Sequence, residues 1–275
     1  CIRDSLQNSL SHISSISLSD ATAPTIHLST AIYNQYLNVF TKFAVGTDYT
    51  LYLDGGPVVD IATALDNASL HQFGFAVVDA YGNLDLNDAA QQAVLAKASS
   101  ITLNGVPAGQ ATAILGKYVN ATLAISDSSA NIANNLDALQ THLASIGSIT
   151  QTGDLEPLVI TEAQLTVDAG VLELLDNYTL VVGEVAAKDA QSLVANHPEI
   201  ISIAVSDALI NLVNYAPELI ALSSNTPNVL STVTLSSASP VTLSYQDLYI
   251  TKLLDAGLTI GDYNDYLQVL LRLLA

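Results

Sequence analysis

The sequence predicts an α/β fold in the form of a parallel β/α solenoid of about ten strand–helix units, with a leucine-rich-repeat-like architecture. Three observations predict it. Short apolar runs alternate with helical patterns, similar stretches recur along the chain, and no Gly-rich phosphate turn follows the first strand. The missing turn disfavours the rival α/β architecture, an open Rossmann-type sheet. We expect residues 1–275 to form a single solenoid repeat domain.

The stretch 122–144 shows the repeating unit most clearly. Leu123 and Ile125 predict a short buried strand. Ser126 and Asp127 follow it and can cap a helix, because their side-chain oxygens accept hydrogen bonds from the first-turn N–H groups. One apolar face of a single amphipathic helix comes next, formed by Ile132, Leu136, Leu139 and Leu143. The phrase returns at 203–222 with Asp207 in place of Asp127, so both aspartates are interpreted as helix caps.

Repetition extends over most of the chain. Three pairs of stretches match, namely 4–16 with 137–149, 49–67 with 178–196, and 124–139 with 204–219. Strand cores are expected near Ile16, Leu51, Phe75, Ile101, Leu123, Ile149, Leu180, Ile203, Val233 and Leu258. The helices between them imply parallel pairing, because each helix serves as the crossover to the next strand. At roughly 4.8 Å per strand, about ten units would form a sheet on the order of 50 Å long.

Three units are longer than the rest and contain a second extended segment before their helix. Pro24, Pro157 and Pro240 lie in the middle of these segments. Proline cannot donate to a sheet ladder, so each should end one extended piece and begin another.

The composition limits the classes of partner. The chain has 26 acidic and 7 basic residues, for a net charge of −19. This charge argues against nucleic acid and against an anionic membrane surface, which both attract basic patches. It fits a surface protein or one that meets Ca²⁺, whose preferred ligands are oxygens. No transmembrane segment is expected, because polar residues interrupt the most apolar run, 200–222.

The ends of the chain predict association. Residues 4–16 correspond to the helix and the next strand of a Ser-Asp unit, so the sequence begins inside a unit, and the last residues, YLQVLLRLLA, are apolar almost all round. A solenoid with uncapped ends associates end to end. We therefore expect other copies of the chain or neighbouring repeats as partners, and a segment of a longer protein. Cys1, the single cysteine, excludes an internal disulfide and could be either a fragment end or a lipid-modified residue.

The motifs of common enzymes are absent from the sequence. It contains no G-x-S-x-G elbow, no P-loop and no H-E-x-x-H pair, and its five histidines are scattered. We expect no enzymatic activity, no catalytic residues and no bound organic cofactor. Three N-x-[ST] sequons begin at Asn67, Asn120 and Asn177. The twelve tyrosines would form an adhesive or carbohydrate-binding surface if they clustered on one face.

Calcium is the one metal for which the sequence offers candidate ligands. The stretch DAYGNLDLND gathers oxygen-bearing side chains around Gly82, namely those of Asp79, Asn83, Asp85, Asn87 and Asp88. It matches neither the EF-hand pattern nor the nine-residue Gly/Asp repeat of RTX proteins. A weaker cluster comprises Asp262, Asn264 and Asp265. Capped turns with a solvated acidic rim are the alternative interpretation of both clusters.

The Ser-Asp phrases also support a family resemblance. VSDALINLVNYAPELIAL and ISDSSANIANNLDALQTHLASIGSITQTGDLEPLVITEAQLTVDAGVL resemble repeats of large secreted surface proteins of Gram-negative bacteria, adhesin-like or S-layer-like and sometimes beside RTX segments. The resemblance implies an extracellular or cell-surface location, type I secretion and a structural role, with no catalytic residues to carry over. We expect a structural or adhesive repeat protein of a surface layer, filament or adhesin stalk. The alternative is a solenoid module that binds a glycan or protein.

Overall fold

The computed structural model describes residues 2–18, 22–43, 49–66, 73–224 and 228–236. Within these residues the chain forms ten strands. They are β1 (Thr25–Leu28), β2 (Thr50–Leu53), β3 (Phe73–Ala80), β4 (Ser100–Val106), β5 (Ala121–Asp127), β6 (Ile146–Gln151), β7 (Leu158–Thr161), β8 (Leu180–Val185), β9 (Ile200–Asp207) and β10 (Leu230–Leu235).

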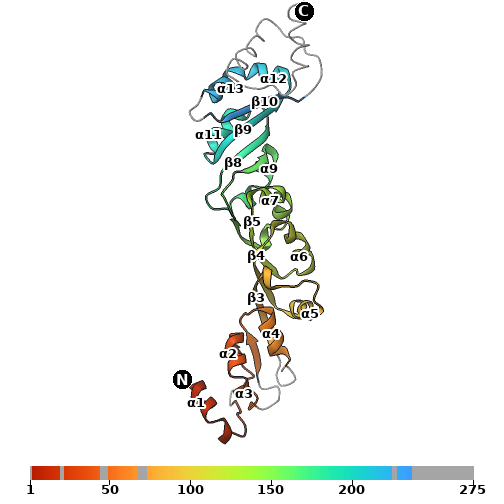
Figure 1. The fold of residues 1–275 in the computed structure, drawn as a ribbon, viewed down its shortest axis with the longest axis vertical. Helices are drawn as coiled ribbons and strands as arrows, with labels where there is room; N and C mark the ends of the chain where they lie inside the picture. The colour runs from red at the N-terminus through yellow and green to blue at the C-terminus, as the bar shows by residue number, and fades with distance from the viewer. Residues whose placement is uncertain (1, 19–21, 44–48, 67–72, 225–227, 237–275) are drawn as a thin grey trace, which may run out of the picture. The chain divides into compact units, whose positions relative to one another are not determined.

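Helices separate most of these strands (Figure 1). The α-helices are α1 (Ile2–Asn8), α2 (Thr30–Gln35), α3 (Leu37–Phe40), α4 (Val58–Leu65), α5 (Ala89–Lys97), α6 (Ala111–Lys117), α7 (Ser129–Asn134), α8 (Leu136–Thr141), α9 (Glu162–Val167), α10 (Ala169–Leu172), α11 (Ala190–Asn196), α12 (Leu209–Asn214) and α13 (Ala216–Ser223). Short 3₁₀ turns are η1 (Leu10–His12), η3 (Tyr81–Asn83), η4 (Ala108–Gln110) and η5 (Leu143–Ser145).

The strands pair in chain order. One sheet has the order β1-β2-β3-β4-β5-β6 and the other has the order β10-β9-β8-β7. The pairs β1–β2, β2–β3, β3–β4, β4–β5, β7–β8, β8–β9 and β9–β10 are all parallel. The predicted α/β class with parallel strands is therefore confirmed, and within each sheet every strand lies beside its neighbour in the chain.

Two compact units contain these sheets. The first comprises 1–127 and 141–150, and the second comprises 128–140 and 151–275. The first unit holds β1 to β5 and most of β6, and the second holds β7 to β10. No helix among the described residues is both long and apolar enough to cross a membrane.

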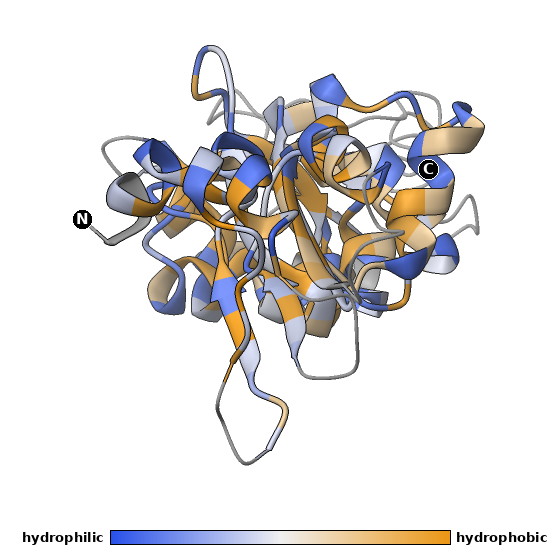
Figure 2. Cartoon of the chain, turned by 90° about the horizontal axis from the view of Figure 1, so that it is seen from below, coloured by the Kyte–Doolittle hydropathy of each residue, from blue (hydrophilic) through white to orange (hydrophobic). Residues whose placement is uncertain are grey.

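Each sheet is buried on one face only. In β5 the side chains of Ala121, Leu123 and Ile125 are buried, whereas Thr122 between them is exposed. In β7, Leu158 is 0% exposed but its neighbour Val159 is 68% exposed. Parallel strands covered on both faces are apolar along their whole length, so this alternation indicates helices on one face only. Figure 2 shows the strands as largely hydrophobic, with the hydrophilic residues mostly on turns and outer helix turns.

The predicted strand positions are mostly confirmed. Eight of the predicted cores, from Leu51 to Val233, fall within β2 to β6 and β8 to β10. The prediction near Ile16 is wrong, because that residue makes only an isolated bridge to Phe43 and the first strand begins at Thr25. The core near Leu258 lies outside the described residues. Pro24 and Pro157 directly precede β1 and β7, the second extended segments of their units, and Pro240 lies outside the described residues.

The internal repeat is present in the structure at the level of whole elements. Helices α2 and α3 recur as α9 and α10 with identical lengths, 132 positions later. Helix α7 recurs as α12, 80 positions later. Ser29 and Thr161 cap equivalent helices, each accepting a hydrogen bond from the backbone N–H three residues on. The sequence matches thus correspond to repeated local folding.

The helix predicted after β5 as one continuous element is two short helices, α7 and α8. The break lies at Asn135, whose side-chain amide donates to the Asn131 carbonyl at 2.8 Å. The Asn135 backbone N–H then bonds the Ile132 carbonyl at 3.0 Å, so the i−4 ladder is interrupted. The apolar face is nevertheless correct, because Ile132, Leu136 and Leu139 are fully buried.

Candidate functional site

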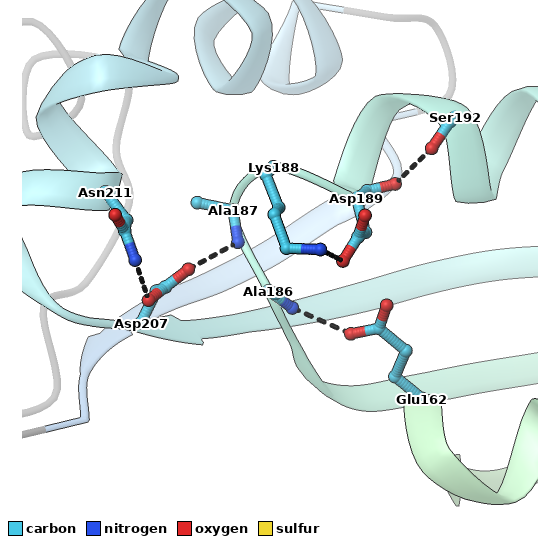
Figure 3. Close-up of polar contacts among 8 residues, drawn as sticks. All are labelled: Glu162, Ala186, Ala187, Lys188, Asp189, Ser192, Asp207 and Asn211. Atoms are coloured by element: carbon cyan, nitrogen blue, oxygen red, sulfur yellow. Dashed lines mark hydrogen bonds and ion pairs between the residues drawn. The ribbon is translucent and has the colours of Figure 1, made fainter.

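The most distinctive polar feature is a carboxylate at the end of a strand. Asp207 is the last residue of β9, and its Oδ2 accepts the backbone N–H of Ala187 at 2.9 Å (Figure 3). Its Oδ1 accepts the N–H of Ala208 and the side-chain amide of Asn211, both at 2.7 Å. Ala187 lies in the turn between β8 and α11. One carboxylate therefore ties the end of its own strand to the helix entry of the preceding unit.

The same link occurs at Asp79, in the compact unit that contains the first sheet. Asp79 Oδ2 accepts the N–H of Val58, the first residue of α4, at 2.9 Å. Its Oδ1 accepts the N–H of Ala80 at 2.8 Å and the side-chain amide of Asn83 at 2.9 Å. The geometry at Asp79 therefore reproduces the geometry at Asp207, contact for contact.

A third link is made by Asp127 at the end of β5. Its Oδ2 accepts the N–H of Ala108, the first residue of η4, at 2.9 Å. All three links share the sequence pattern D-x-x-x-N, at Asp79–Asn83, Asp127–Asn131 and Asp207–Asn211. We call these three contacts the strand-end links.

Each strand-end link satisfies an N–H group that has no partner inside its own helical turn. The first N–H groups of a helix point away from its hydrogen-bond ladder and carry partial positive charge, so a carboxylate is their best acceptor. Here the acceptor comes from the next strand along the sheet. The contact therefore fixes the register between one strand–helix unit and the next.

The interpretation of Asp127 and Asp207 as caps of their own helices is therefore wrong for Asp127 and incomplete for Asp207. Ser128 is the residue that caps α7, accepting the Asn131 N–H at 3.3 Å. Asp207 does accept the N–H of Ala208, just before α12, but its second oxygen serves the preceding unit. The sequence identified the right residues but not the second helix entry that each one binds, because that partner lies about 20 residues upstream.

Charged residues surround the link at Asp207. Glu162, at the start of α9, accepts the N–H of Ala186 at 2.8 Å, so adjacent N–H groups bind carboxylates from two neighbouring elements. Lys188 Nζ donates to Asp189 at 2.8 Å, and this hydrogen bond and the charge of Asp189 raise the Lys188 pKa. The pKa of this lysine is also raised by the Glu162 carboxylate.

The pKa of Asp207 follows from its contacts. Burial alone would raise it, since a carboxylate loses hydration. The hydrogen bonds from Asn211, Ala187 and Ala208, together with the Lys188 ammonium, outweigh burial and lower the pKa below its ordinary value. The link is therefore ionised and intact at neutral pH.

The five calcium candidates are divided between separate turns. Asp79 and Asn83 meet at 2.9 Å, but both Asp79 oxygens accept N–H donors. Asp85 accepts the backbone N–H of Asn87 at 2.9 Å, and Asp88 caps α5. Within the part of the chain that the structure describes, no three His, Cys, Asp or Glu side chains come together as metal ligands. Asp262, Asn264 and Asp265 lie outside that part.

The structure also contains a buried acid that the sequence patterns do not identify. Asp168 is 0% exposed and directly precedes α10 as its N-cap residue. Burial, a hydrogen bond shared with the Asp137 carboxyl and the charge of that carboxyl together raise the pKa of Asp168 to about 6. Asp137 itself accepts from the Gln164 amide at 3.3 Å. Two carboxyl groups thus share a site in which one favours a proton.

Two histidines pair with acids, and two sequons can be located. His27 Nδ1 lies 2.5 Å from Asp54 Oδ1, and His197 Nδ1 lies 2.9 Å from Glu199 Oε1.

Of the sequon asparagines, Asn120 donates its side-chain amide to the Ala98 carbonyl at 2.7 Å, whereas Asn177 is exposed with φ 54°. Asn67 lies outside the described residues.

No family model matches the chain, and comparisons with curated proteins and with solved structures give no significant match.

Proposed function

We propose that the chain is a structural or adhesive repeat segment of an extracellular protein, part of a surface layer, filament or adhesin stalk. In this proposal the strand–helix units form a leucine-rich-repeat-like solenoid of about ten units. The consecutive parallel strand order supports it, because a unit added at a sheet edge leaves the others unchanged. The exposed sheet face supports it too, since solenoids bury one strand face under their helices.

The recurring strand-end links carry the proposal. An Asp at the end of one strand binds the helix entry of the preceding unit at Asp79, Asp127 and Asp207. Each contact fixes the register of one strand–helix unit against the next. Its recurrence supports a scaffold whose role depends on stacking.

The acidic composition fits a surface protein. A net charge of −19 keeps an apolar repeat chain dispersed in water by self-repulsion. The resemblance of the Ser-Asp phrases to bacterial surface repeats points the same way. The proposed partners are other copies of the chain or neighbouring repeats, bound end to end.

Two measurements test the proposal. Sedimentation velocity across a concentration series, followed by electron microscopy, should reveal species larger than the monomer that grow in one dimension. A chain that stays monomeric at every concentration would contradict the assembly part. Antibody labelling of intact source cells should detect the chain without permeabilisation, and labelling only after permeabilisation would contradict the surface location.

A further inference from the structure

An aromatic ring lies across the exposed face of the first sheet. Tyr52 is on β2, and the strand register places His27 on one side of it and Gly74 on the other. A Cβ atom on Gly74 would lie 2.7 Å from Tyr52 Cδ2 and 3.1 Å from Cε2. The ring therefore occupies the space above the glycine, where any other residue would displace it.

Hydrogen bonds fix this ring in place. The Tyr52 hydroxyl lies 2.5 Å from Ser99 Oγ, and Ser99 Oγ donates its own hydrogen to the Phe75 carbonyl at 2.7 Å. Tyr52 must then be the donor to Ser99, since the serine hydroxyl has one hydrogen. These hydrogen bonds restrict the Tyr52 side chain before a ligand arrives, which lowers the entropic cost of binding.

A second ring extends the surface. The His27 and Tyr52 ring centroids lie 4.9 Å apart at an interplanar angle of 38°. His27 is oriented by Asp54, at 2.5 Å, and the two side chains are 58% and 49% exposed. We call His27, Tyr52, Asp54 and Ser99 the Tyr52 platform. It places a partly exposed aromatic ring beside an exposed imidazole and an exposed carboxylate.

We propose that the Tyr52 platform is a binding site for a neutral saccharide. A sugar ring has one apolar C–H face, which packs against an aromatic ring, and a rim of hydroxyl groups. Asp54 accepts hydrogen bonds from hydroxyls, and the imidazole can donate or accept. The proposal goes beyond the structural role proposed above, and rests on it only for the extracellular setting in which glycans are met.

Charge selects among the possible occupants. The Asp54 carboxylate and the net charge of −19 repel acidic saccharides and the phosphates of nucleotides. A neutral saccharide incurs no such repulsion and matches the mixed apolar and polar surface.

The compact unit that contains the second sheet has a row of residues at equivalent positions, but this row lacks the aromatic ring. In its sheet the equivalent row, by register and by distance from the helix cap, is Val159, Val181 and Ser202. No aromatic ring occupies this row, so it should not bind saccharides. The platform is therefore a local addition to the repeat and not part of the framework.

The test is titration calorimetry of the full chain with cellohexaose, chitohexaose and mannohexaose, beside polygalacturonate as an acidic probe. At least one neutral oligomer should bind, with Kd on the order of 1 mM for a single stacked ring. Tyr52→Ala should weaken binding by about tenfold or more, as expected for an anchoring tyrosine. Tyr52→Phe should retain most of the affinity because it keeps the ring.

The control is Tyr81→Ala, which removes a partly exposed tyrosine of η3 outside the platform and should leave binding unchanged. His27→Ala provides a second test at an exposed position if Tyr52→Ala folds poorly, and it should also weaken binding. Absence of binding to all neutral oligomers overturns the proposal, as does equal binding by Tyr52→Ala or preference for polygalacturonate. Because sedimentation and labelling test the structural role separately, failure of one proposal is distinguishable from failure of the other.

Discussion

Replacing Asp207 with asparagine tests whether the strand-end links hold neighbouring units together. The wild-type carboxylate accepts three hydrogen bonds, two at Oδ1 and one at Oδ2. Asparagine keeps one oxygen and presents an NH₂ group in place of the other, so at least one N–H donor faces another donor. Hydrogen bonds to a charged acceptor contribute about 1.5–3 kcal/mol each. Since Asp207 is only partly buried, we expect Asp207→Asn to cost about 2 kcal/mol at pH 7.

The pH dependence of this cost has a definite sign. The folded-state pKa of Asp207 is lowered, so its stabilisation is fully present above the unfolded value of about 3.9 and is lost as pH falls through the folded pKa. Wild type and Asp207→Asn should therefore differ in urea unfolding at pH 7 and converge well below pH 4. The exposed control, Asp176→Asn, should change stability by no more than about 0.5 kcal/mol.

Amide exchange locates the effect. Protection of the Ala187 N–H should fall in Asp207→Asn, while amides in the centre of β8 should change far less. If Asp207→Asn and Asp176→Asn unfold alike and the Ala187 amide keeps its protection, the strand-end link contributes nothing and the reasoning is refuted.

Three further predictions follow from single contacts. Leu158→Ala should cost about 2–5 kcal/mol, because it opens a cavity, whereas Val159→Ala on the exposed face should stay within about 0.5 kcal/mol; equal costs in urea unfolding would contradict a sheet buried on one face. Asp168→Asn should raise the melting temperature at pH 7, where the buried carboxylate is ionised against a pKa of about 6, and the gain should shrink as pH falls toward about 4, where folded and unfolded wild type both take up the proton. A gain in melting temperature that does not depend on pH would show that ionisation of Asp168 is not its cause. Millimolar Ca²⁺ should leave the melting temperature unchanged, because both Asp79 oxygens already bind N–H donors; an upward shift that Asp79→Asn abolishes would establish a calcium site.

The fold class could be predicted because it depends on periodicity within short segments. The alternation at Leu123 and Ile125 and the helical spacing of Ile132, Leu136 and Leu139 are local properties of the chain. Each of these residues is fully buried or nearly so, as the pattern requires. Element boundaries were less predictable. The break at Asn135 depends on one side chain taking the carbonyl that the helix would use, which apolar spacing does not record.

The strand core predicted near Ile16 is wrong for a related reason, whereas the second extended segment predicted after Pro24 is β1. Both Ile16 and Ile26 lie in apolar, β-branched surroundings, and the sequence gives no preference between them. Pairing decides the outcome, because Ile26 lies beside Leu51 of β2 while Ile16 meets only Phe43. A strand that needs a partner cannot be located from its own residues alone.

Contacts across the sheet were the hardest to predict, and the candidate sites depend on them. A shift of one position in the β2–β3 register would turn Tyr52 away from Gly74. The Tyr52 ring would then no longer occupy the space that a Cβ atom at position 74 would need. The strand-end links depend on register in the same way, because Asp79 reaches Val58 only if β3 ends level with the start of α4. Each link in turn fixes that register, since a shifted strand would leave both a carboxylate and a helix N–H without a partner. The stacking of the units and the geometry of the candidate sites therefore both depend on strand register. A variant that weakens a strand-end link should also weaken the contacts on the exposed sheet face beside it.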